Sequence, residues 1–198
     1  MTYICRLISQ SKMDKQKKIL ASALKLFVEN GFHGTPTSKI AKEAGVANGT
    51  LFHYYPTKDD LIISLYIAIK MEMSCFVESN TAIEGDFKTR FKNQFVHALY
   101  WSIDHPDEFL YIQQFYASPF AVQLQSEVLQ KQMEKTCMEI QQAIDSKVIK
   151  SFPVDYIFTM ISSHLNGINQ YLRKANLNAD QQKDLIAQTF DLLWDMLT

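Results

Sequence analysis

The feature that most constrains the fold is Gly45, a glycine placed between two short stretches of helical periodicity. Ile40 and Ala44 recur at helical spacing before it, and Leu51 follows it on what should be a second inner face. Glycine leaves a helix through a left-handed conformation at no steric cost, and Val46 can fill the gap between the two helices. The spacing therefore predicts two short helices joined by a tight turn. This is the arrangement of a helix-turn-helix motif, which places its second helix in the major groove of DNA.

The residues around the turn indicate where each short helix begins. Thr35 is predicted to cap the first helix, with Pro36 at the first helical position, where its missing N–H costs nothing. The second helix is expected over about 48–54. Gly49 within it costs about 1 kcal/mol relative to Ala, which suggests that the backbone approaches a phosphate or a base edge there. The side chains that should face outward from this helix can all form hydrogen bonds: Asn48, Thr50, His53 and Tyr54.

The stretch from Gly31 to Leu61 resembles the DNA-binding domain of the TetR family of bacterial transcription repressors. The residues that agree in register with the family's pattern are Gly31, Phe32, Thr35, Ile40, Ala41, Ala44, Gly45, Val46, Gly49, Thr50, Leu51, Tyr54, Lys58 and Leu61. Four positions depart from it. Pro36 replaces a small hydroxyl residue, Ala47 replaces a capping Ser, Phe52 replaces a Tyr and Tyr55 replaces a Phe. Because Phe52 lacks the hydroxyl with which the family's Tyr touches a phosphate, only packing is expected of it.

The resemblance implies a set of DNA-contacting residues on the two short helices and at the start of the next. They are Thr37, Ser38, Asn48, Gly49, Thr50, His53, Tyr54 and Lys58. The apolar residues of the motif are assigned to the core. Asn48 has a second explanation, since it could take over the cap that Ala47 cannot provide. Lys58 stands at the start of a helix, where a cation opposes the helix dipole, so a phosphate partner explains its position better than local stability does.

The distribution of charge agrees with a DNA partner at the amino-terminal end. Residues 1–60 carry 9 Lys and Arg against 5 Asp and Glu, whereas residues 61–198 carry 11 against 16, within a net charge of −1. Basic side chains bind a polyanion by releasing its condensed counterions. The amino-terminal part is therefore the one suited to DNA, and two copies in a dimer would double its surplus of positive charge.

Almost all of the remaining sequence has helical periodicity, and no strand or hairpin pattern competes with it. We predict an all-α fold of about nine helices. Outside the motif, helices are expected over about 12–30, 58–79, 87–104, 106–117, 119–148, 154–175 and 179–197. Three parts are predicted: a loose amino-terminal extension over 1–11, a helix-turn-helix DNA-binding domain over 12–57, and a larger effector-binding and dimerisation domain over 58–198.

The last two predicted helices carry more apolar surface than one buried face requires. Leu192, Leu193, Trp194 and Met196 leave little polar surface on the final turns. The pair could simply close the core of a monomer. The resemblance favours a homodimer, because family members pair these two helices with their symmetry mates in a four-helix bundle. Two copies would also present two second helices to the half-sites of a near-palindromic DNA operator.

The segment between the motif and these last helices is rich in aromatic residues, which build both cores and small-molecule pockets. The resemblance implies that an unknown, largely hydrophobic effector binds there and releases the operator. The predicted ligand-binding residues are Phe91, Phe95, Trp101, Phe115, Tyr116, His164 and Asn169. His97, Gln113 and Gln114 are further polar candidates. For each aromatic residue, plain core packing is the alternative.

Other functional classes find little support in the sequence. There is no glycine-rich phosphate loop, nucleophile elbow or pair of His residues at metal-ligand spacing, so we expect no enzyme, no cofactor and no metal site. Cys5, Cys75 and Cys137 are too dispersed for a disulfide framework, and no apolar run is long enough to span a membrane, which favours a cytoplasmic protein. The alternatives within the DNA-binding class are an architectural protein that takes no ligand and a regulator switched by a protein partner.

Overall fold

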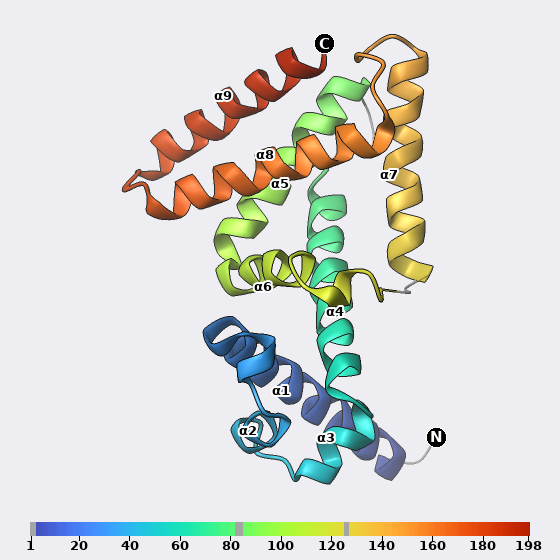
Figure 1. Ribbon diagram of the computed structural model, residues 1–198, viewed down its shortest axis with the longest axis vertical. Helices are drawn as coiled ribbons and strands as arrows, with labels where there is room; N and C mark the ends of the chain where they lie inside the picture. The colour runs from blue at the N-terminus through green and yellow to red at the C-terminus, as the bar shows by residue number, and fades with distance from the viewer. Residues whose placement is uncertain (1–2, 82–84, 125–126) are drawn as a thin grey trace. The chain divides into compact units, whose positions relative to one another are not determined.

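The computed structural model describes residues 3–81, 85–124 and 127–198. Within these residues the chain forms nine α-helices and one short 3-10 helix, and no strand (Figure 1). The predicted all-α fold is confirmed. The chain divides into two compact units, one formed by Met1–Lys70 with Asp107–Leu124 (unit 1) and the other by Met71–Pro106 with Gln125–Thr198 (unit 2).

Unit 1 contains the predicted helix-turn-helix motif. Its elements are α1 (Tyr3–Gly34), α2 (Thr37–Glu43), α3 (Asn48–Tyr54), the first part of α4 (Lys58–Asn80), almost all of α6 (Pro106–Tyr116) and the 3-10 helix η1 (Pro119–Ala121). The short helix α2 packs against both α1 and α3. Fully buried side chains from α1, α2, α3 and α4 include Ile19, Phe27, Ile40, Leu51, Leu61 and Ile62.

The first helix differs from its predicted bounds at both ends. It begins at Tyr3, so the predicted loose extension over 1–11 is helical from Tyr3 onward, and the sequence has no Gly or Pro between Tyr3 and Gly31 to interrupt it. At the other end the backbone leaves helical geometry at Gly31, as expected, with a φ of 72°. The chain resumes a helical turn after this kink and ends it at Gly34.

The helix α6 lies within unit 1 and is held there by aromatic side chains. The hydroxyl of Tyr111 donates a hydrogen bond to the carbonyl oxygen of Ile62 at 2.9 Å. The ring of Phe115 stacks on that of Tyr66 with 3.9 Å between centroids. Burial raises the pKa of both tyrosines well above the usual value for a phenol. The helix-turn-helix motif therefore shares its compact unit with a helix that follows it by about fifty residues.

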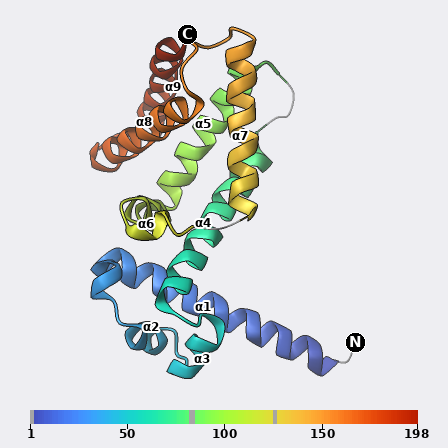
Figure 2. The same cartoon turned by 45° about the vertical axis from the view of Figure 1, so that its right-hand side comes forward.

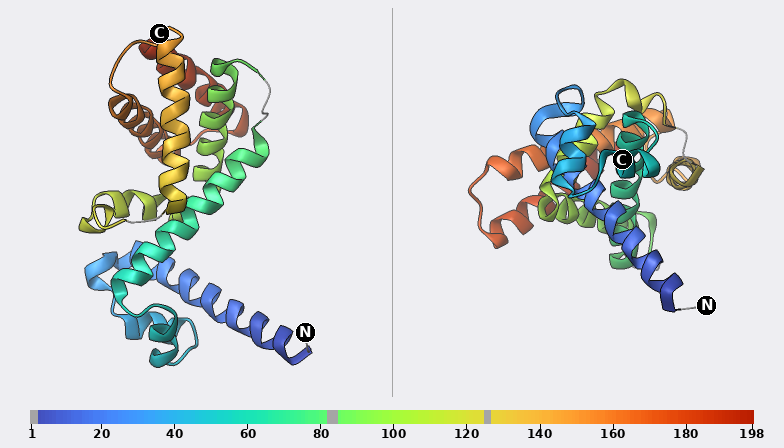
Figure 3. Two further views of the ribbon diagram at one scale, coloured as in Figure 1. Left: turned by 90° about the vertical axis from the view of Figure 1, so that its right-hand side faces the viewer. Right: turned by 90° about the horizontal axis from the view of Figure 1, so that it is seen from below.

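Unit 2 is a bundle built on the rest of α4 and on α5 (Phe87–Asp104), α7 (Glu127–Asp145), α8 (Val154–Lys174) and α9 (Ala179–Leu197). The helix α5 packs against α8 and α9, and α7 packs against α8. Figure 1 and the right-hand view of Figure 3 show α8 and α9 joined by a short turn and running in roughly opposite directions, and the two helices pack against each other. The side chains of Phe91, Phe95 and Leu99 on α5 face the core of this bundle. Its other members include Ile157, Ile186, Phe190 and Leu193.

Several helix starts follow from local sequence, whereas α7 does not follow its predicted bounds. Asp86 caps α5 by accepting a hydrogen bond from the Thr89 amide, and Asn178 caps α9 in a reciprocal capping box with Gln181. The predicted long helix over 119–148 is instead η1 followed by α7. Val122 after η1 is 91% exposed, so no buried apolar face continues the helix there. At the far end α7 stops before Lys147, whose φ of 57° is left-handed.

Candidate nucleic-acid interface and ligand pocket

The start of α2 is fixed by Pro36, and Thr35 has a different role from the one predicted. Pro36 is the N-cap residue, in an extended conformation, and its carbonyl oxygen accepts hydrogen bonds from the amides of Lys39 and Ile40. Thr35 is fully buried, and its hydroxyl donates to the carbonyl oxygens of Leu26 and Gly31 at 3.0 and 2.8 Å. The prediction of Thr35 as the cap was therefore wrong. The hydroxyl ties the turn before α2 to the end of α1.

The turn between α2 and α3 has the predicted geometry. Gly45 adopts a φ of 66°, and its amide donates to the carbonyl oxygen of Lys42 at 3.1 Å. The half-buried Val46 follows it, and its amide donates to the carbonyl oxygen of Ala41 at 3.0 Å. On the inner side, α3 is anchored by Leu51, which is 0% exposed, and Tyr55 directly after the helix is also buried. The position of α3 is thus set by a short turn and two buried side chains.

The amino-terminal end of α3 carries no side-chain cap. Ala47 is the N-cap residue, and Asn48 occupies the first helical position, so Asn48 does not take over the role that Ala47 leaves open. In the described part of the chain no side-chain hydrogen bond caps this helix. Capping therefore does not explain Asn48, and its side chain is exposed to solvent.

The eight residues predicted to contact DNA all lie in unit 1, on α2, on α3 and at the start of α4, elements that Figure 2 shows next to one another. The exposed members are Ser38, Asn48, Gly49 and His53, and the half-buried ones are Thr37, Thr50, Tyr54 and Lys58. On α3 the ring of His53 meets that of Tyr54 edge to face at 5.6 Å. The structure brings the predicted residues together on neighbouring elements and leaves four of them open to a partner.

The start of α4 holds Lys58 in a defined place. The amide and hydroxyl of Thr57 donate to Oδ2 of Asp60 at 3.0 and 2.7 Å, and the Asp60 amide donates back to the Thr57 hydroxyl at 3.0 Å. The two residues therefore form a reciprocal cap, the pattern of a capping box. Lys58 follows directly as the first residue of the helix. Across the described ranges no carboxylate lies within 4 Å of its ammonium group, which leaves its charge available for a phosphate.

The sequence interpretation missed Phe52. It was expected only to pack, yet its side chain is 40% exposed on α3. A helix turns by 100° per residue, so a side chain next to the buried Leu51 points well away from the inner face. Counting helical positions from Leu51 would have identified Phe52 as an outward residue.

Three of the predicted ligand-binding residues gather in unit 2 around Phe190. The rings of Phe91 and Phe95 lie 5.4 and 5.8 Å from that of Phe190, and the ring of His164 stacks on Phe95 at 5.9 Å. Nε2 of His164 donates to the carbonyl oxygen of Thr189 at 2.9 Å. These aromatic residues are therefore packed against one another, as core residues are.

Two more predicted ligand-binding residues, Trp101 and Asn169, are fully buried in the same unit. Asn169 donates from Nδ2 to the hydroxyl oxygen of Ser102 at 2.8 Å, and Trp101 stacks on His105 at 4.8 Å. Four buried polar atoms of unit 2 have no hydrogen-bond partner within the described residues: Oδ1 of Asn169, Nε1 of Trp101, Nδ1 of His97 and Oγ1 of Thr81. Buried polar atoms of this kind are usually satisfied by a ligand or by water.

The last two predicted ligand-binding residues belong to unit 1. Phe115 is fully buried against Tyr66, and Tyr116 is half exposed with its ring edge-on to Tyr66 at 5.8 Å. The predicted set is thus divided between two compact units. Residue spacing along the chain gave no indication of this division.

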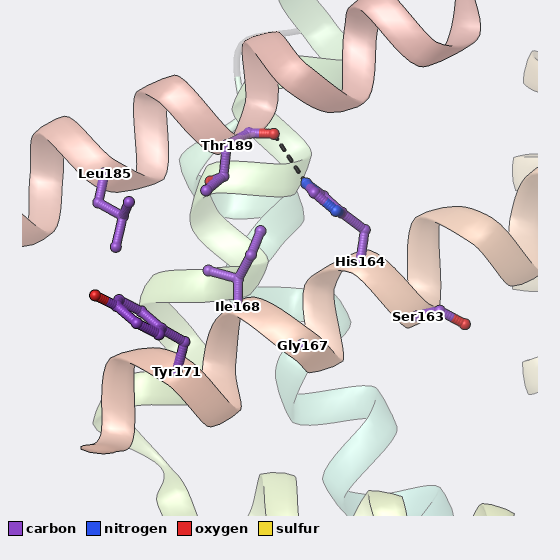
Figure 4. Close-up of a pocket in the computed structure, with 7 residues that line it drawn as sticks. All are labelled: Ser163, His164, Gly167, Ile168, Tyr171, Leu185 and Thr189. Atoms are coloured by element: carbon purple, nitrogen blue, oxygen red, sulfur yellow. Dashed lines mark hydrogen bonds between the residues drawn. The ribbon is translucent and has the colours of Figure 1, made fainter. Parts of the chain in front are cut away.

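A pocket of about 390 Å³ lies between α8 and α9 in unit 2 (Figure 4). Ile168, Tyr171 and Leu185 give it a mainly apolar lining, and the His164 side chain closes one end through its hydrogen bond to Thr189. Ser163 and Gly167 complete the lining. Of the seven residues predicted to bind a ligand, His164 is the one that lines this pocket.

Among the described residues, no group of three or more His, Cys, Asp or Glu side chains is placed to hold a metal ion. None of the described helices is both long enough and apolar enough to cross a membrane.

The left-handed glycine between the short helices α2 and α3 defines a helix-turn-helix motif. The family described as "Bacterial regulatory proteins, tetR family" matches residues 19–65. The "Fatty acid metabolism regulator protein" of Bacillus subtilis is 40% identical over 81 residues, which are 41% of this chain and 39% of that protein. The "HTH-type transcriptional regulator RutR" of Escherichia coli K12 is 43% identical over 61 residues, 31% of this chain and 27% of that protein. The chain thus matches less than half the length of these curated relatives.

Solved structures match over nearly the whole chain. A putative tetR family transcription regulator from Shewanella sp. PV-4 is 28% identical, with a TM-score of 0.81 over 92% of this chain and 97% of that one. FadR from Bacillus subtilis, solved in complex with stearoyl-CoA, shares the fold at 20% identity, with a TM-score of 0.73 over 92% of this chain and 99% of that one. Residues 19–65 therefore match the TetR family of bacterial regulatory proteins, and the chain shares its fold with solved structures of that family.

Proposed function

We propose that this protein is a DNA-binding transcriptional regulator, a repressor that a small, largely hydrophobic effector releases from a near-palindromic operator. The observation that carries the proposal is the construction of α3. Leu51 and Tyr55 anchor it from behind, while Asn48, Gly49 and His53 are exposed on its outer face. A short helix held in this way can enter a major groove with its hydrogen-bonding residues toward the bases.

The surroundings of α3 support the same function. Ser38 is exposed at the start of α2, and Lys58, whose ammonium group has no carboxylate within 4 Å among the described residues, is the first residue of α4. Contacts of this kind to phosphates would fix the orientation of α3 without reading sequence themselves. In this proposal Thr37, Ser38 and Lys58 position the protein, and Asn48, Thr50, His53 and Tyr54 contact the bases or the adjoining backbone. The protein is accordingly not an enzyme and works in the bacterial cytoplasm, where an operator is accessible.

A homodimer formed through α8 and α9 is the second part of the proposal. Each of these helices buries one face inside unit 2, yet large apolar side chains are also exposed on the rest of its surface. The exposed ones are Tyr156 and Tyr171 on α8 and Leu192 and Met196 on α9. The apolar pocket between the two helices adds to this surface. A self-complementary contact across it would bury these residues and join two DNA-binding units by a twofold axis, as a palindromic operator requires.

Effector binding is the third part, and it rests on unit 2. Oδ1 of Asn169, Nε1 of Trp101 and Nδ1 of His97 are buried polar atoms without a partner among the described residues, and the same unit contains the aromatic cluster of Phe91, Phe95 and Phe190. We assign the ligand contacts in unit 2 to Phe91, Phe95, Trp101, His164 and Asn169. For Phe115 and Tyr116, which lie in unit 1, we keep the ligand-binding role predicted from the sequence. An effector that favours one position of α4, a helix shared by both units, would alter the spacing of the two α3 helices in the dimer.

The proposal is tested by selecting duplexes from a random library with the purified protein. The expected product is a near-palindrome whose half-site centres lie about 34 Å apart. Thr50→Ala should then lose discrimination between the selected duplex and a scrambled one. Recovery of duplexes with no shared sequence would contradict the proposal and favour an architectural DNA-binding protein.

The effector is tested separately by thermal unfolding in the presence of candidate ligands. A ligand that binds only the folded protein raises its melting temperature by mass action. The panel should include long-chain acyl-CoA thioesters, because stearoyl-CoA is bound in the FadR structure of the same fold. A ligand that raises the melting temperature but leaves operator affinity unchanged would contradict release by an effector.

A further inference from the structure

The outer face of α3 is not purely polar. The residues of this helix that are exposed are Asn48, Gly49, Phe52 and His53. Asn48 precedes Phe52 by four residues and Gly49 precedes it by three, so both are its neighbours on the helix surface. Phe52 therefore lies within the exposed face that the proposed function directs at DNA, and it is the apolar side chain on that face.

Gly49 provides a second and independent observation. A Cβ atom built on it would find no other heavy atom within 4 Å in the described structure, and its φ is not in the left-handed region. Neither packing inside the protein nor backbone conformation therefore requires a glycine. A glycine inside a helix nevertheless weakens it relative to alanine. The missing side chain beside Phe52 thus indicates that something outside the chain approaches the helix closely at this point.

The chemistry of the major groove identifies a matching group on DNA. The base edges there carry hydrogen-bond donors, acceptors and one apolar group, the 5-methyl group of thymine. A phenyl ring can neither donate to an acceptor on a base nor reach a phosphate through a hydroxyl. It can make an apolar contact with the thymine methyl group.

We propose that Phe52 is a specificity-determining residue that recognises a thymine in each half-site through its 5-methyl group, with Gly49 leaving room for the base edge. This inference rests on the proposed function and deepens it, because it names the base and the atom that the exposed ring reads. The neighbouring Asn48 and His53 supply the hydrogen bonds on either side of this apolar contact.

The experiment replaces single thymines by deoxyuridine in the selected operator. This change removes the methyl group and keeps the base pairing. For the unchanged protein, one symmetric pair of replacements should weaken binding by about 4-fold per half-site, the effect of one apolar carbon leaving a contact. For Phe52→Ala the same replacements should change binding by less than about 2-fold, because the partner of the methyl group is then absent.

Two further variants sharpen the test. Phe52→Leu keeps an apolar side chain and should retain part of the sensitivity to deoxyuridine. Phe152→Ala removes an exposed ring of similar accessibility in unit 2 and should leave the ratio of thymine to deoxyuridine affinities unchanged. Because Phe52 is 40% exposed, Phe52→Ala should keep the circular dichroism spectrum and melting temperature of the parent protein.

The outcomes separate the inference from the proposed function. The inference is overturned if deoxyuridine weakens binding at none of the thymine positions. It is also overturned if Phe52→Ala loses as much affinity on replacement of thymine as the unchanged protein does. If the library yields no preferred sequence at all, the proposed function fails first.

Discussion

Tyr111 on α6 donates its hydroxyl hydrogen to the carbonyl oxygen of Ile62 on α4 at 2.9 Å, inside the compact unit that carries the helix-turn-helix motif. The two residues lie 49 positions apart in the chain. This bond, together with the stack of Phe115 on Tyr66, fixes a late helix against the helix that leaves the DNA-binding motif. Any signal that moves α6 would therefore act directly on α4.

Tyr111→Phe should lower the free energy of unfolding by about 1 kcal/mol, the usual net value of one hydrogen bond. The loss is modest because the ring remains to fill the core and the Ile62 carbonyl keeps its place in the helix. Denaturant titration measures it. Tyr100→Phe, which removes the hydroxyl of a half-buried tyrosine of α5, is the matched control and should be neutral. Equal effects of the two changes would mean that the buried bond contributes nothing to stability.

Gly49→Ala should increase stability and weaken DNA binding at the same time. Alanine in a helix interior is favoured over glycine by up to about 1 kcal/mol, and the added Cβ meets no atom of the described structure within 4 Å. A base edge that approaches Gly49 would meet the new methyl group. Gly45→Ala is the contrasting variant, because its φ of 66° makes alanine unfavourable by about 1 kcal/mol or more. Unchanged operator affinity for Gly49→Ala would show that nothing approaches there.

Lys58→Gln should weaken binding to the operator and to scrambled DNA by similar factors. A lysine that neutralises one phosphate contributes about one to the slope of log affinity against log salt concentration, so the slope should fall by about one per protomer. The control is Lys92→Gln, since Lys92 lies in unit 2 and pairs with Asp191 at 3.4 Å. A salt dependence that stays the same after Lys58→Gln would remove the phosphate assignment.

Leu192→Glu should convert the proposed dimer to a monomer. Leu192 is 61% exposed on α9, and a carboxylate there would be buried and unpaired in a dimer contact. Light scattering at micromolar concentration measures the change in mass. Met138→Glu on α7, where the side chain is 58% exposed, tests whether any charge on an exposed apolar residue has this effect. Dimers that persist in Leu192→Glu would place the interface elsewhere.

The stability of unit 2 should depend on pH through Asp86. Hydrogen bonds from Thr89 at the start of α5 hold the pKa of Asp86 below its usual value. A carboxyl group with a depressed folded pKa stabilises the protein above its unfolded pKa of about 4, and this contribution is lost as the pH falls through the lower folded value. Melting temperatures of the parent protein and Asp86→Asn should therefore converge between about pH 4 and pH 2. A constant difference would show that the cap does not titrate.

The parts of the fold that local chemistry decides were predictable from sequence. The exit of α2 needs a left-handed residue and Gly45 is one, while Thr57 and Asn178 begin their helices through side chains within three residues. Thr35 was mistaken for a cap because a threonine before a proline has that local pattern. Its hydroxyl instead bonds to Leu26, nine residues away, and such a contact depends on how the chain folds back.

The candidate site shows the same division between features that local sequence decides and features that depend on how the chain folds. The residues predicted to contact DNA lie within about twenty residues of one another, and helical spacing placed four of the eight on an exposed surface. The ligand residues were drawn from a longer segment in which Phe91 lies in unit 2 and Phe115 in unit 1. Composition indicates aromatic enrichment but not which rings face one another. Phe52 was assigned to packing from a family comparison, although its position next to Leu51 already directed it outward.

The exposed apolar face of α8 and α9 has a consequence for how such a regulator would respond to its own abundance. If two chains must associate before both half-sites are occupied, the amount of the competent species rises with the square of chain concentration while monomers predominate. Doubling synthesis would then raise occupancy of the operator up to fourfold, and modest dilution during cell growth would empty it disproportionately. Tyr171, Leu192 and their exposed neighbours would thereby set a copy-number threshold for the control of the regulated gene.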